Sequence, residues 1–518
     1  MRDQYAVDRR QFLALAGSTT LAAGLGFSPA AWAATPRQSL TVGTRTIEVN
    51  GKAATVFGIT DTNGRSGLIL DAAGGFNVSL TNATDVATIM HWHGLTPPFG
   101  MDGNPLSQQP IAPGASMAYS FDLPRGGTNW MHSHFGLQET QLMAAPLIVR
   151  EGEPQMQEVV VLLHDFSFTP PEEILATLKG KGAAVVGSGT AAMDMGMPGS
   201  GTAMPGMAMG GMAGMDHSGM TMNGNDGATA MPGMNMRGMA MGGMAMGTMD
   251  MDLNDITFDA YLANDRTLAD PEIVGVDKGD TVLLRIINGA ASTNFWIDLG
   301  QIEGTVKAVD GMPVQPLRGS RFGLAMAQRI DIEVTMPADG AAVPVLAQRE
   351  GDIARTGIVL APTGATVTKI AAAADTKSAP VLLELERQLV AASPLSAKPV
   401  TLQIMAMLTG DMQTYVWGID GRTFDNRQPL EVSMGDRVEV TMHNMTMMSH
   451  PMHLHGHHFQ VVGIDGQKIS GAMRDTVLVP AMGMVTIQFD ADNPGEWPLH
   501  CHNLYHMAAG MMTTVKYV

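Results

Sequence analysis

Short runs of β-branched and aromatic residues recur along the chain, separated by glycine, proline, asparagine and aspartate. Long stretches with the period of an amphipathic helix are scarce. Short apolar runs bounded by turn-forming residues are typical of β-strands. The pattern therefore predicts an all-β protein whose strands pack as sandwiches.

A weak internal repeat indicates how many sandwiches to expect. Residues 76–82 (FNVSLTN), 282–288 (VLLRIIN) and 438–444 (VEVTMHN) each have the pattern of a strand that ends in asparagine. Three copies predict three related domains. A charged turn at 150–153 and an alanine-rich, proline-containing stretch at 371–399 are the candidate linkers. We expect domains at 34–155, 156–385 and 386–518.

The repeat also locates the chemistry. Nine residues beyond each asparagine the chain reads HWHG (91–94), IDLG (297–300) and HLHG (453–456). Phe-Asp at 121–122 precedes His132 by the same distance at which Phe-Asp at 489–490 precedes His500. The middle copy has lost its histidines, so a site is expected between the first and last domains.

The N-terminus has the pattern of an export signal. Arg9-Arg10-Gln11-Phe12-Leu13 opens a short apolar run that ends before Ala31-Trp32-Ala33. Paired arginines resemble a twin-arginine signal, which would carry a folded protein to the periplasm. A membrane anchor is the alternative, but the run is short and broken by glycine and serine. We therefore expect a signal peptide at 1–33, no stable anchor, and the twin-arginine export machinery as a partner.

Composition narrows the possible functions. The formal charge of −18, from 31 basic and 49 acidic residues, argues against nucleic acid as a partner. Residues 183–255 are rich in methionine, glycine and alanine, and we expect a mobile loop inserted in the second domain. The single cysteine, Cys501, cannot form an internal disulfide and lies between two histidines.

Ten of the 15 histidines fall into four clusters. Alternate residues of a strand share a face, so each His-x-His pair can point two imidazoles into one space. Eight such imidazoles could hold three copper ions: His91, His93, His132, His134, His453, His455, His500 and His502.

The remaining candidate ligands match a blue-copper site. Two imidazoles and a thiolate, with a weak axial thioether, form a one-electron relay. His450, Cys501, His506 and Met511 supply this set. Cys501 should face the relay while its two neighbours face the other coppers, so the backbone would connect the two sites.

The motifs HWHG, HSH, HPMHLHG and HCHNLYHMAAGM together resemble the multicopper oxidase family, over nearly the whole chain after residue 33. The resemblance implies three cupredoxin-like domains, four copper ions and dioxygen as electron acceptor. It assigns His450, Cys501, His506 and Met511 to the type 1 copper and His91 and His453 to the type 2 copper. It assigns the type 3 pair to His93, His132 and His502, and to His134, His455 and His500.

Reduction of dioxygen to water also needs four protons. Asp102 resembles the acid that the family uses beside its trinuclear site, although a turn-forming role before Gly103 is the alternative. Asp310-Gly311 and Asp465-Gly466 occupy similar places in the other domains and favour that alternative. Many bacterial relatives carry glutamate where this chain has Met507, which leaves the second proton donor open.

The context Tyr505-His506-Met507 and Met511-Met512, together with the methionine-rich insertion, resembles the copper-resistance branch of the family, whose members act as periplasmic cuprous oxidases. Thioethers prefer Cu(I), so the insertion, with Met215 and His217, is a candidate collector, or else a flexible linker. Met448 matches a substrate position of the cuprous oxidases, but an acid expected two residues earlier is Thr446. We expect a monomeric Cu(I) oxidase. The alternatives are a laccase acting on phenols or aromatic amines, a copper-sequestering protein, and a scaffold without activity.

Overall fold

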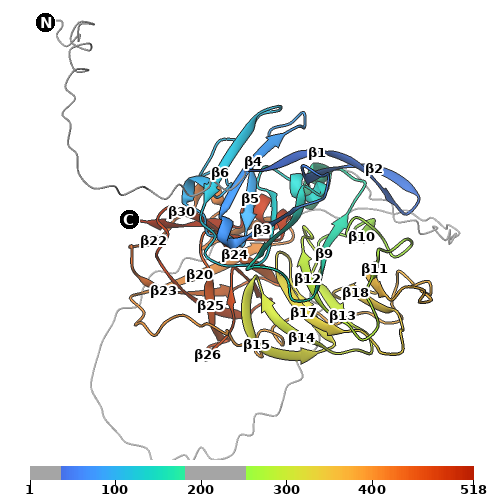
Figure 1. Cartoon of the computed structure of the whole chain (residues 1–518). Coiled ribbons are helices and arrows are strands. Elements are labelled where there is room, and N and C mark those ends of the chain that lie inside the picture. Colours follow the sequence, from blue (N-terminus) through green and yellow to red (C-terminus); the bar gives the residue numbers. More distant parts are fainter. Residues whose placement is uncertain (1–36, 181–252) are drawn as a thin grey trace, which may run out of the picture.

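The computed structural model describes residues 37–180 and 253–518 (Figure 1). Strands dominate, which confirms the predicted all-β class. The described helices are α1 (Pro171–Leu178), α2 (Leu504–Ala508) and the 3₁₀ turns η1 (Ala72–Gly74), η2 (Phe99–Met101), η3 (Gln138–Gln141) and η4 (Phe424–Asn426). The expected signal peptide, Met215 and His217 lie outside the described residues.

The first pair of sheets is built from residues 38–150. One sheet has the order β2-β1-β4-β6, and the other β3-β8-β7-β5. Their inward side chains share one hydrophobic core, as in a sandwich. The strands are β1 (Gln38–Val49), β2 (Lys52–Asp61), β3 (Leu68–Asp71), β4 (Phe76–Asn82), β5 (Met90–His93), β6 (Ser116–Phe121), β7 (Gly127–Ser133) and β8 (Ala144–Arg150).

The second pair of sheets is built from residues 157–361. Its orders are β10-β9-β12-β17-β14-β15 and β11-β19-β18-β13-β16. The strands are β9 (Gln157–Phe166), β10 (Ala260–Ala263), β11 (Ile273–Gly275), β12 (Thr281–Asn288), β13 (Phe295–Asp298), β14 (Gly304–Val309), β15 (Met312–Gly319), β16 (Arg321–Leu324), β17 (Arg329–Thr335), β18 (Val343–Arg349) and β19 (Arg355–Ala361).

The third pair of sheets is built from residues 402–517. One sheet has the order β21-β20-β23-β29-β25-β26, with β27 paired to β25, and the other β22-β31-β30-β24-β28. The strands are β20 (Leu402–Asp411), β21 (Val416–Ile419), β22 (Leu430–Val432), β23 (Arg437–Asn444), β24 (His450–Leu454), β25 (Phe459–Ile464), β26 (Gln467–Lys468), β27 (Met473–Arg474), β28 (Thr476–Val479), β29 (Met484–Asp490), β30 (Glu496–Cys501) and β31 (Met512–Tyr517). The boundaries near 155 and 385 stay predictions.

The repeated asparagine has one structural role in all three copies. Asn82, Asn288 and Asn444 end β4, β12 and β23, and each is fully buried. Each side-chain amide donates hydrogen bonds to loop carbonyls, for example from Asn82 to Val86 (2.7 Å) and from Asn444 to Met448 (2.7 Å). The asparagine therefore fixes the loop that leads to the next strand, which in the first and third copies carries the histidines.

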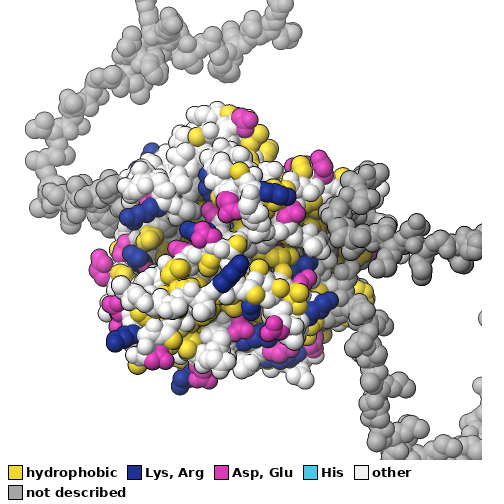
Figure 2. Space-filling view, turned by 90° about the vertical axis from the view of Figure 1, so that its right-hand side faces the viewer, with side chains coloured by type: hydrophobic (Ala, Val, Ile, Leu, Met, Phe, Trp, Pro, Cys, Tyr) yellow, Lys and Arg dark blue, Asp and Glu magenta, His cyan; other side chains and the backbone are white. Residues whose placement is uncertain are grey.

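The surface agrees with the acidic composition. The face in Figure 2 carries acidic and basic side chains interspersed, without a continuous basic patch. Among the described residues, no helix has the length and apolar character needed to cross a bilayer.

Candidate metal centre

Four strands carry six of the ten clustered histidines, and their pairing is the same in two sandwiches. In the first, β5 pairs with β7 and places His91 opposite His132. In the third, β24 pairs with β30 and places His453 opposite His500. Figure 1 shows β5 and β24 near the centre of the molecule. The first and third sandwiches therefore meet at their histidine strands.

The imidazoles converge in groups whose nitrogens lie within 4.8 Å of one another. Pairs of nitrogens face each other closely: His91 and His453 at 3.4 Å, and His455 and His500 at 3.0 Å. The groups are His91 with His93 and His453; His93 with His132 and His502; and His134 with His455 and His500. The structure thus brings together the eight histidines that the sequence singled out for three coppers.

Burial keeps these imidazoles neutral. Removal from water lowers the pKa of His91, His93, His134, His453, His455 and His502 well below its usual range, and that of His500 to about 4. Two protonated imidazoles repel each other, so neighbouring histidines lower these pKa values further. Since a metal ligand must offer an unprotonated nitrogen, the cluster is ready to bind at neutral pH.

Hydrogen bonds orient several of the rings. The Nδ1 atoms of His91, His453 and His500 lie 2.9–3.0 Å from backbone carbonyl oxygens, which leaves Nε2 free for the cluster. His93 is reversed, because its Nε2 lies 3.0 Å from Asp475 Oδ1.

The middle sandwich supports this arrangement although it lacks histidine pairs. Arg329 at the start of β17 is fully buried and donates to Asp475 Oδ1 at 2.7 Å. Burial raises the pKa of Asp475, and the guanidinium of Arg329 opposes that rise. The second domain thus holds the carboxylate that orients His93.

A second group lies on the other face of β30. Cys501 Sγ is 3.6 Å from His450 Nδ1 and 3.8 Å from His506 Nδ1, and these two nitrogens are 3.1 Å apart. The helix α2 supplies His506, and Asn503 caps it by accepting hydrogen bonds from Tyr505 and His506 backbone N–H groups. Met511 is fully buried, and its carbonyl accepts from Cys501 N.

Asp255 is part of this second group, and sequence reasoning missed it. Its Oδ2 lies 2.8 Å from His506 Nε2 and accepts a hydrogen bond from Tyr415 Oη at 2.6 Å. Burial would raise the pKa of Asp255, but His506, Tyr415 and Asn503 together hold it below its usual value. The expected mobile loop at 183–255 is therefore wrong at its end, since Asp255 is packed against a candidate copper ligand.

Asp102 also lies at the cluster. It is fully buried at the end of η2, with Oδ2 2.8 Å from His455 Nδ1 and its carbonyl 3.0 Å from His91 Nδ1. Burial raises the pKa of Asp102 to about 7, although a hydrogen bond from Asn104 lowers it. A Cβ on Gly103 (φ +84°) would lie 1.7 Å from the Met90 carbonyl, so this turn is pressed against β5.

The comparable aspartates of the other domains differ from Asp102. Asp310 and Asp465 have φ near +50° and lie in the hairpins β14–β15 and β25–β26. Asp102 has a right-handed helical backbone and is in no hairpin. Asp102 thus differs in backbone conformation from those two hairpin aspartates, and its role beside the cluster stays a prediction.

Glu139 is a second buried acid that the sequence did not reveal. It lies in η3, with Oε2 2.7 Å from His132 Nδ1 and Oε1 3.8 Å from His502 Nδ1. Among the described residues, Oε1 has no hydrogen-bond partner. The only signal in the sequence was an acid five residues after the HSH motif.

Methionines near the second group differ in exposure. Met448 is buried in the hydrophobic core, whereas Met445 and Met447 are 47% and 42% exposed. Thr446, in place of the expected acid, has its hydroxyl 2.7 Å from His450 Nε2. Met507 is half-buried and lies on α2.

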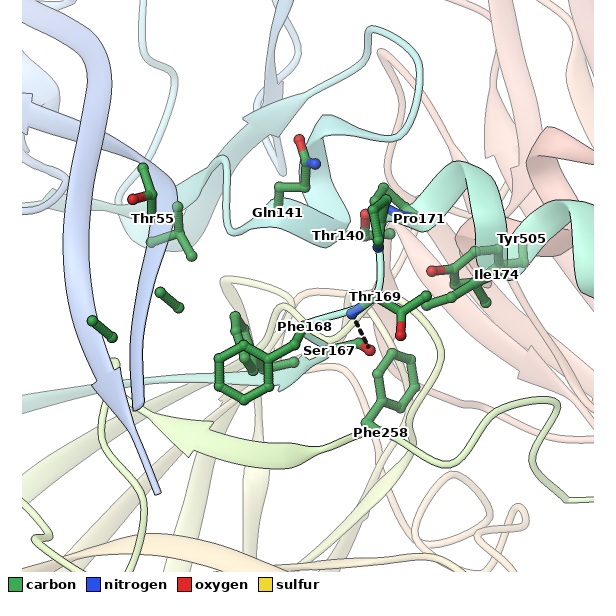
Figure 3. A pocket seen from close by; sticks show the side chains of 15 residues that line it. Thr55, Thr140, Gln141, Ser167, Phe168, Thr169, Pro171, Ile174, Phe258 and Tyr505 are labelled. Atoms are coloured by element: carbon green, nitrogen blue, oxygen red, sulfur yellow. Dashed lines mark hydrogen bonds between the residues drawn. The ribbon is translucent and has the colours of Figure 1, made fainter. Parts of the chain in front are cut away.

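An aromatic pocket lies beside α2. Phe168 and Phe258 line it together with Thr140, Ile174 and Tyr505 (Figure 3). Tyr505 precedes His506 in the chain, but His506 is not among the residues that line the pocket.

The donor sets fit copper. Buried nitrogens of His134 and His502 have no hydrogen-bond partner in residues 37–180 and 253–518, and facing pairs of imidazole nitrogens can share at most one proton. Metal ions among these lone pairs would satisfy them. Imidazoles suit copper in either oxidation state, and the Cys501 set adds the soft thiolate of a blue-copper site.

Comparisons with known proteins agree with this geometry. Three family models, each described as multicopper oxidase, match residues 41–154, 204–357 and 397–518. Multicopper oxidase MmcO of Mycobacterium tuberculosis is 31% identical over 85% of this chain and 79% of its own. A copper resistance protein A homolog of Pseudomonas syringae pv. tomato is 26% identical over 98% of both chains.

The fold is also similar to solved structures. The laccase from Botrytis aclada, at 20% identity, superposes with a TM-score of 0.68 over 93% of this chain and 88% of that one. This likeness shows the same three-sandwich architecture. The chain therefore belongs to the multicopper oxidase family, copper-dependent oxidoreductases that use four copper ions, one of type 1, one of type 2 and a type 3 pair, and pass electrons to dioxygen.

Proposed function

We propose that this protein is a periplasmic cuprous oxidase that protects the cell from copper. Four Cu(I) ions give up one electron each and leave as Cu(II), while one dioxygen takes these electrons with four protons and becomes two waters. Residues 1–33 would export the folded, monomeric enzyme through the twin-arginine machinery.

The observation that carries the Cu(I) assignment is the burial of the type 1 group behind Asp255. His450, Cys501 and His506 are fully buried, and a carboxylate instead of an open cleft covers His506 Nε2. A small cation is attracted by this carboxylate, whereas a phenol ring would have to displace it. Asp255 follows directly on the methionine-rich segment, so the proposed collector, with Met215 and His217, ends at this site.

We propose the following copper ligands from the groups of buried side chains described above. His450, Cys501 and His506 would hold the type 1 copper together with the buried Met511. His91 and His453, whose Nε2 atoms face each other, would hold the type 2 copper. The type 3 pair would be held by His93, His132 and His502, and by His134, His455 and His500. Copper bound there supplies one-electron transfer and the four-electron reduction of dioxygen.

The chain's own residues would guide electrons and protons. Cys501 lies between His500 and His502, so one stretch of β30 connects both groups. Asp102 lies against His455 and Glu139 against His132. In the described part of the chain each acid has one carboxylate oxygen without a hydrogen-bond partner, where a proton can be held. Glu139 would take the place of the glutamate that many bacterial relatives carry where this chain has Met507.

A laccase activity is the second candidate function, and the aromatic pocket favours it. Phe168, Phe258 and Tyr505 could hold a phenol in this pocket, and Tyr505 directly precedes His506 in the chain (Figure 3). Initial rates of oxygen uptake with Cu(I) and with a phenol, at equal copper loading, distinguish the two. A cuprous oxidase consumes one dioxygen per four Cu(I) and has the larger kcat/KM for Cu(I); a sequestering protein consumes none.

A further inference from the structure

The outer face of one third-domain sheet carries methionines that the copper groups do not use. The strands β20, β23 and β29 are neighbours in this sheet. Along β23, Met442 and Asn444 are buried, whereas Thr441 and His443 are half-buried and point to the opposite face. His443 therefore lies on the outside of the sandwich.

Cross-strand register arranges this outer face in rows. One row joins Gln403, Glu439 and Gln488, whose side chains hydrogen-bond at 2.8 Å. The next row includes Thr441 and Thr486, whose hydroxyls are 3.1 Å apart. Side chains in a row thus reach each other across the strands.

The third row consists of soft ligands. His443 pairs with Met407 on β20 and with Met484 on β29, and all three are half-buried. Neighbouring strands lie about 4.8 Å apart, so a flexible thioether flanks the imidazole on each side within reach of a common ion. The ring of His443 has no hydrogen bond, ion pair or ring contact among the described residues.

We propose that Met407, His443 and Met484 form a Cu(I)-binding site on the surface of the third domain. Two neutral thioethers and one imidazole are a soft set that favours Cu(I) over Cu(II) and over hard cations. The role of this site as an entry point for substrate Cu(I) rests on the proposed function.

The backbone holds the two methionines in place. Met407 N donates to Asp420 Oδ1 at 2.8 Å, and Met484 N donates to Asp465 Oδ1 at 3.1 Å. These carboxylates bind backbone N–H groups, and they add negative charge at the edges of the row, which favours a cation.

The site continues toward the type 1 group. Met445 N donates to Leu408 O and Met482 N to Thr446 O, so both exposed methionines lie beside the row. Thr446 in turn contacts His450. The segment from His443 to His450 therefore runs from the proposed site through three methionines to a type 1 ligand.

Silver(I) tests the site in the full-length holoenzyme, because it resembles Cu(I) but does not donate electrons. Peroxide converts accessible methionine to its sulfoxide, and mass spectrometry measures this residue by residue. We expect silver to protect Met407 and Met484 but not the exposed Met434. In His443→Gln the silver needed for half-protection should rise at least about tenfold, since even a lost outer-shell partner costs that much metal affinity.

Met405→Leu is the matched control, because Met405 lies on the same face in the next row. It should leave the protection and the KM for Cu(I) unchanged, whereas Met407→Leu and His443→Gln should raise that KM and leave phenol oxidation unaltered. Protection that is absent, or that persists in His443→Gln, overturns the site even if Cu(I) is oxidised normally. Protection that depends on His443 in an enzyme that oxidises only phenols overturns the proposed function and leaves the binding site standing.

Discussion

The carboxylate of Asp255 lies 2.8 Å from Nε2 of His506, although the two residues are separated by most of the second and third domains. The same oxygen, Oδ2, accepts hydrogen bonds from Tyr415 Oη and Asn503 Nδ2. His506 can therefore donate a proton to an anion while its Nδ1 faces Cys501. Such a bond makes the imidazole a stronger donor to a metal and stabilises the more positive oxidised state.

Asp255→Asn should raise the reduction potential of the type 1 copper, because the amide keeps the shape but removes the negative charge. We expect a shift of about 60 mV, which is tenfold in the equilibrium of a one-electron couple. Redox titration of the blue band measures it. The KM for Cu(I) should rise as well.

Asp259→Asn serves as control, because Asp259 lies four residues further on and its carboxylate accepts hydrogen bonds, within the described part of the chain, only from Ser167 and Phe168. An unchanged potential in Asp255→Asn would remove the charge of Asp255 from any role at the type 1 copper.

Cys501→Ser should abolish the blue charge-transfer band and substrate-driven oxygen uptake, because a hydroxyl cannot replace a soft anionic sulfur. Burial, together with the charge of Asp255, raises the pKa of the Cys501 thiol, so the thiolate depends on the bound copper. The fold should survive, with a cost of about 1–3 kcal/mol for a buried hydroxyl that lacks a partner. Blue colour and turnover in this variant would overturn the ligand assignment.

Many residues of this copper centre could be predicted from the sequence, because the arrangement of the histidines depends on their local spacing. A His-x-His pair on a strand has one geometry, and the repeat aligned the pairs of the first and last domains. Asp255, Glu139 and Arg329 could not be found in this way. Each is a single charged residue without a motif, and only the packing of separate segments brings it to a histidine or, for Arg329, to the carboxylate of Asp475 that contacts His93. Asp102 is intermediate, since its turn was visible but its burial was not.

Asp102→Asn should slow oxygen reduction while copper content and type 1 reduction stay nearly unchanged, because an amide cannot deliver a proton. The pKa of Asp102 is raised to about 7, so the protonated donor is present below that pH and is lost above it. Bound copper would lower the value, which places the fall in wild-type turnover at or below pH 7. A pH series of oxygen uptake checks this: the variant's profile should be flat there. Equal turnover of both proteins at every pH would make Asp102 an ordinary turn residue.

Glu139→Ala should weaken copper binding at the type 3 pair, because His132 loses the carboxylate that orients its ring. The loss of affinity should be about 10- to 100-fold, as for other partners of metal-bound histidines. Copper per chain after dialysis against a chelator measures it. Gln141→Ala, in the same turn but facing the pocket of Figure 3, should keep full copper. Equal copper retention in both variants would contradict the role of Glu139.

Removal of the methionine-rich segment tests the collector, and the position of Asp255 decides where the deletion must end. A cut from 183 to 255 removes the methionines and also the carboxylate on His506, so it cannot separate the two effects. A deletion of residues 183–252 keeps Asp255, and we expect it to load four coppers. Its Cu(I) oxidation should be slower than wild type at low copper, because many weak thioether sites raise the local concentration of substrate. At saturating copper the rates should coincide, and phenol oxidation should be equal or faster. The same Cu(I) rate at every concentration would identify the segment as a linker and end the collector hypothesis.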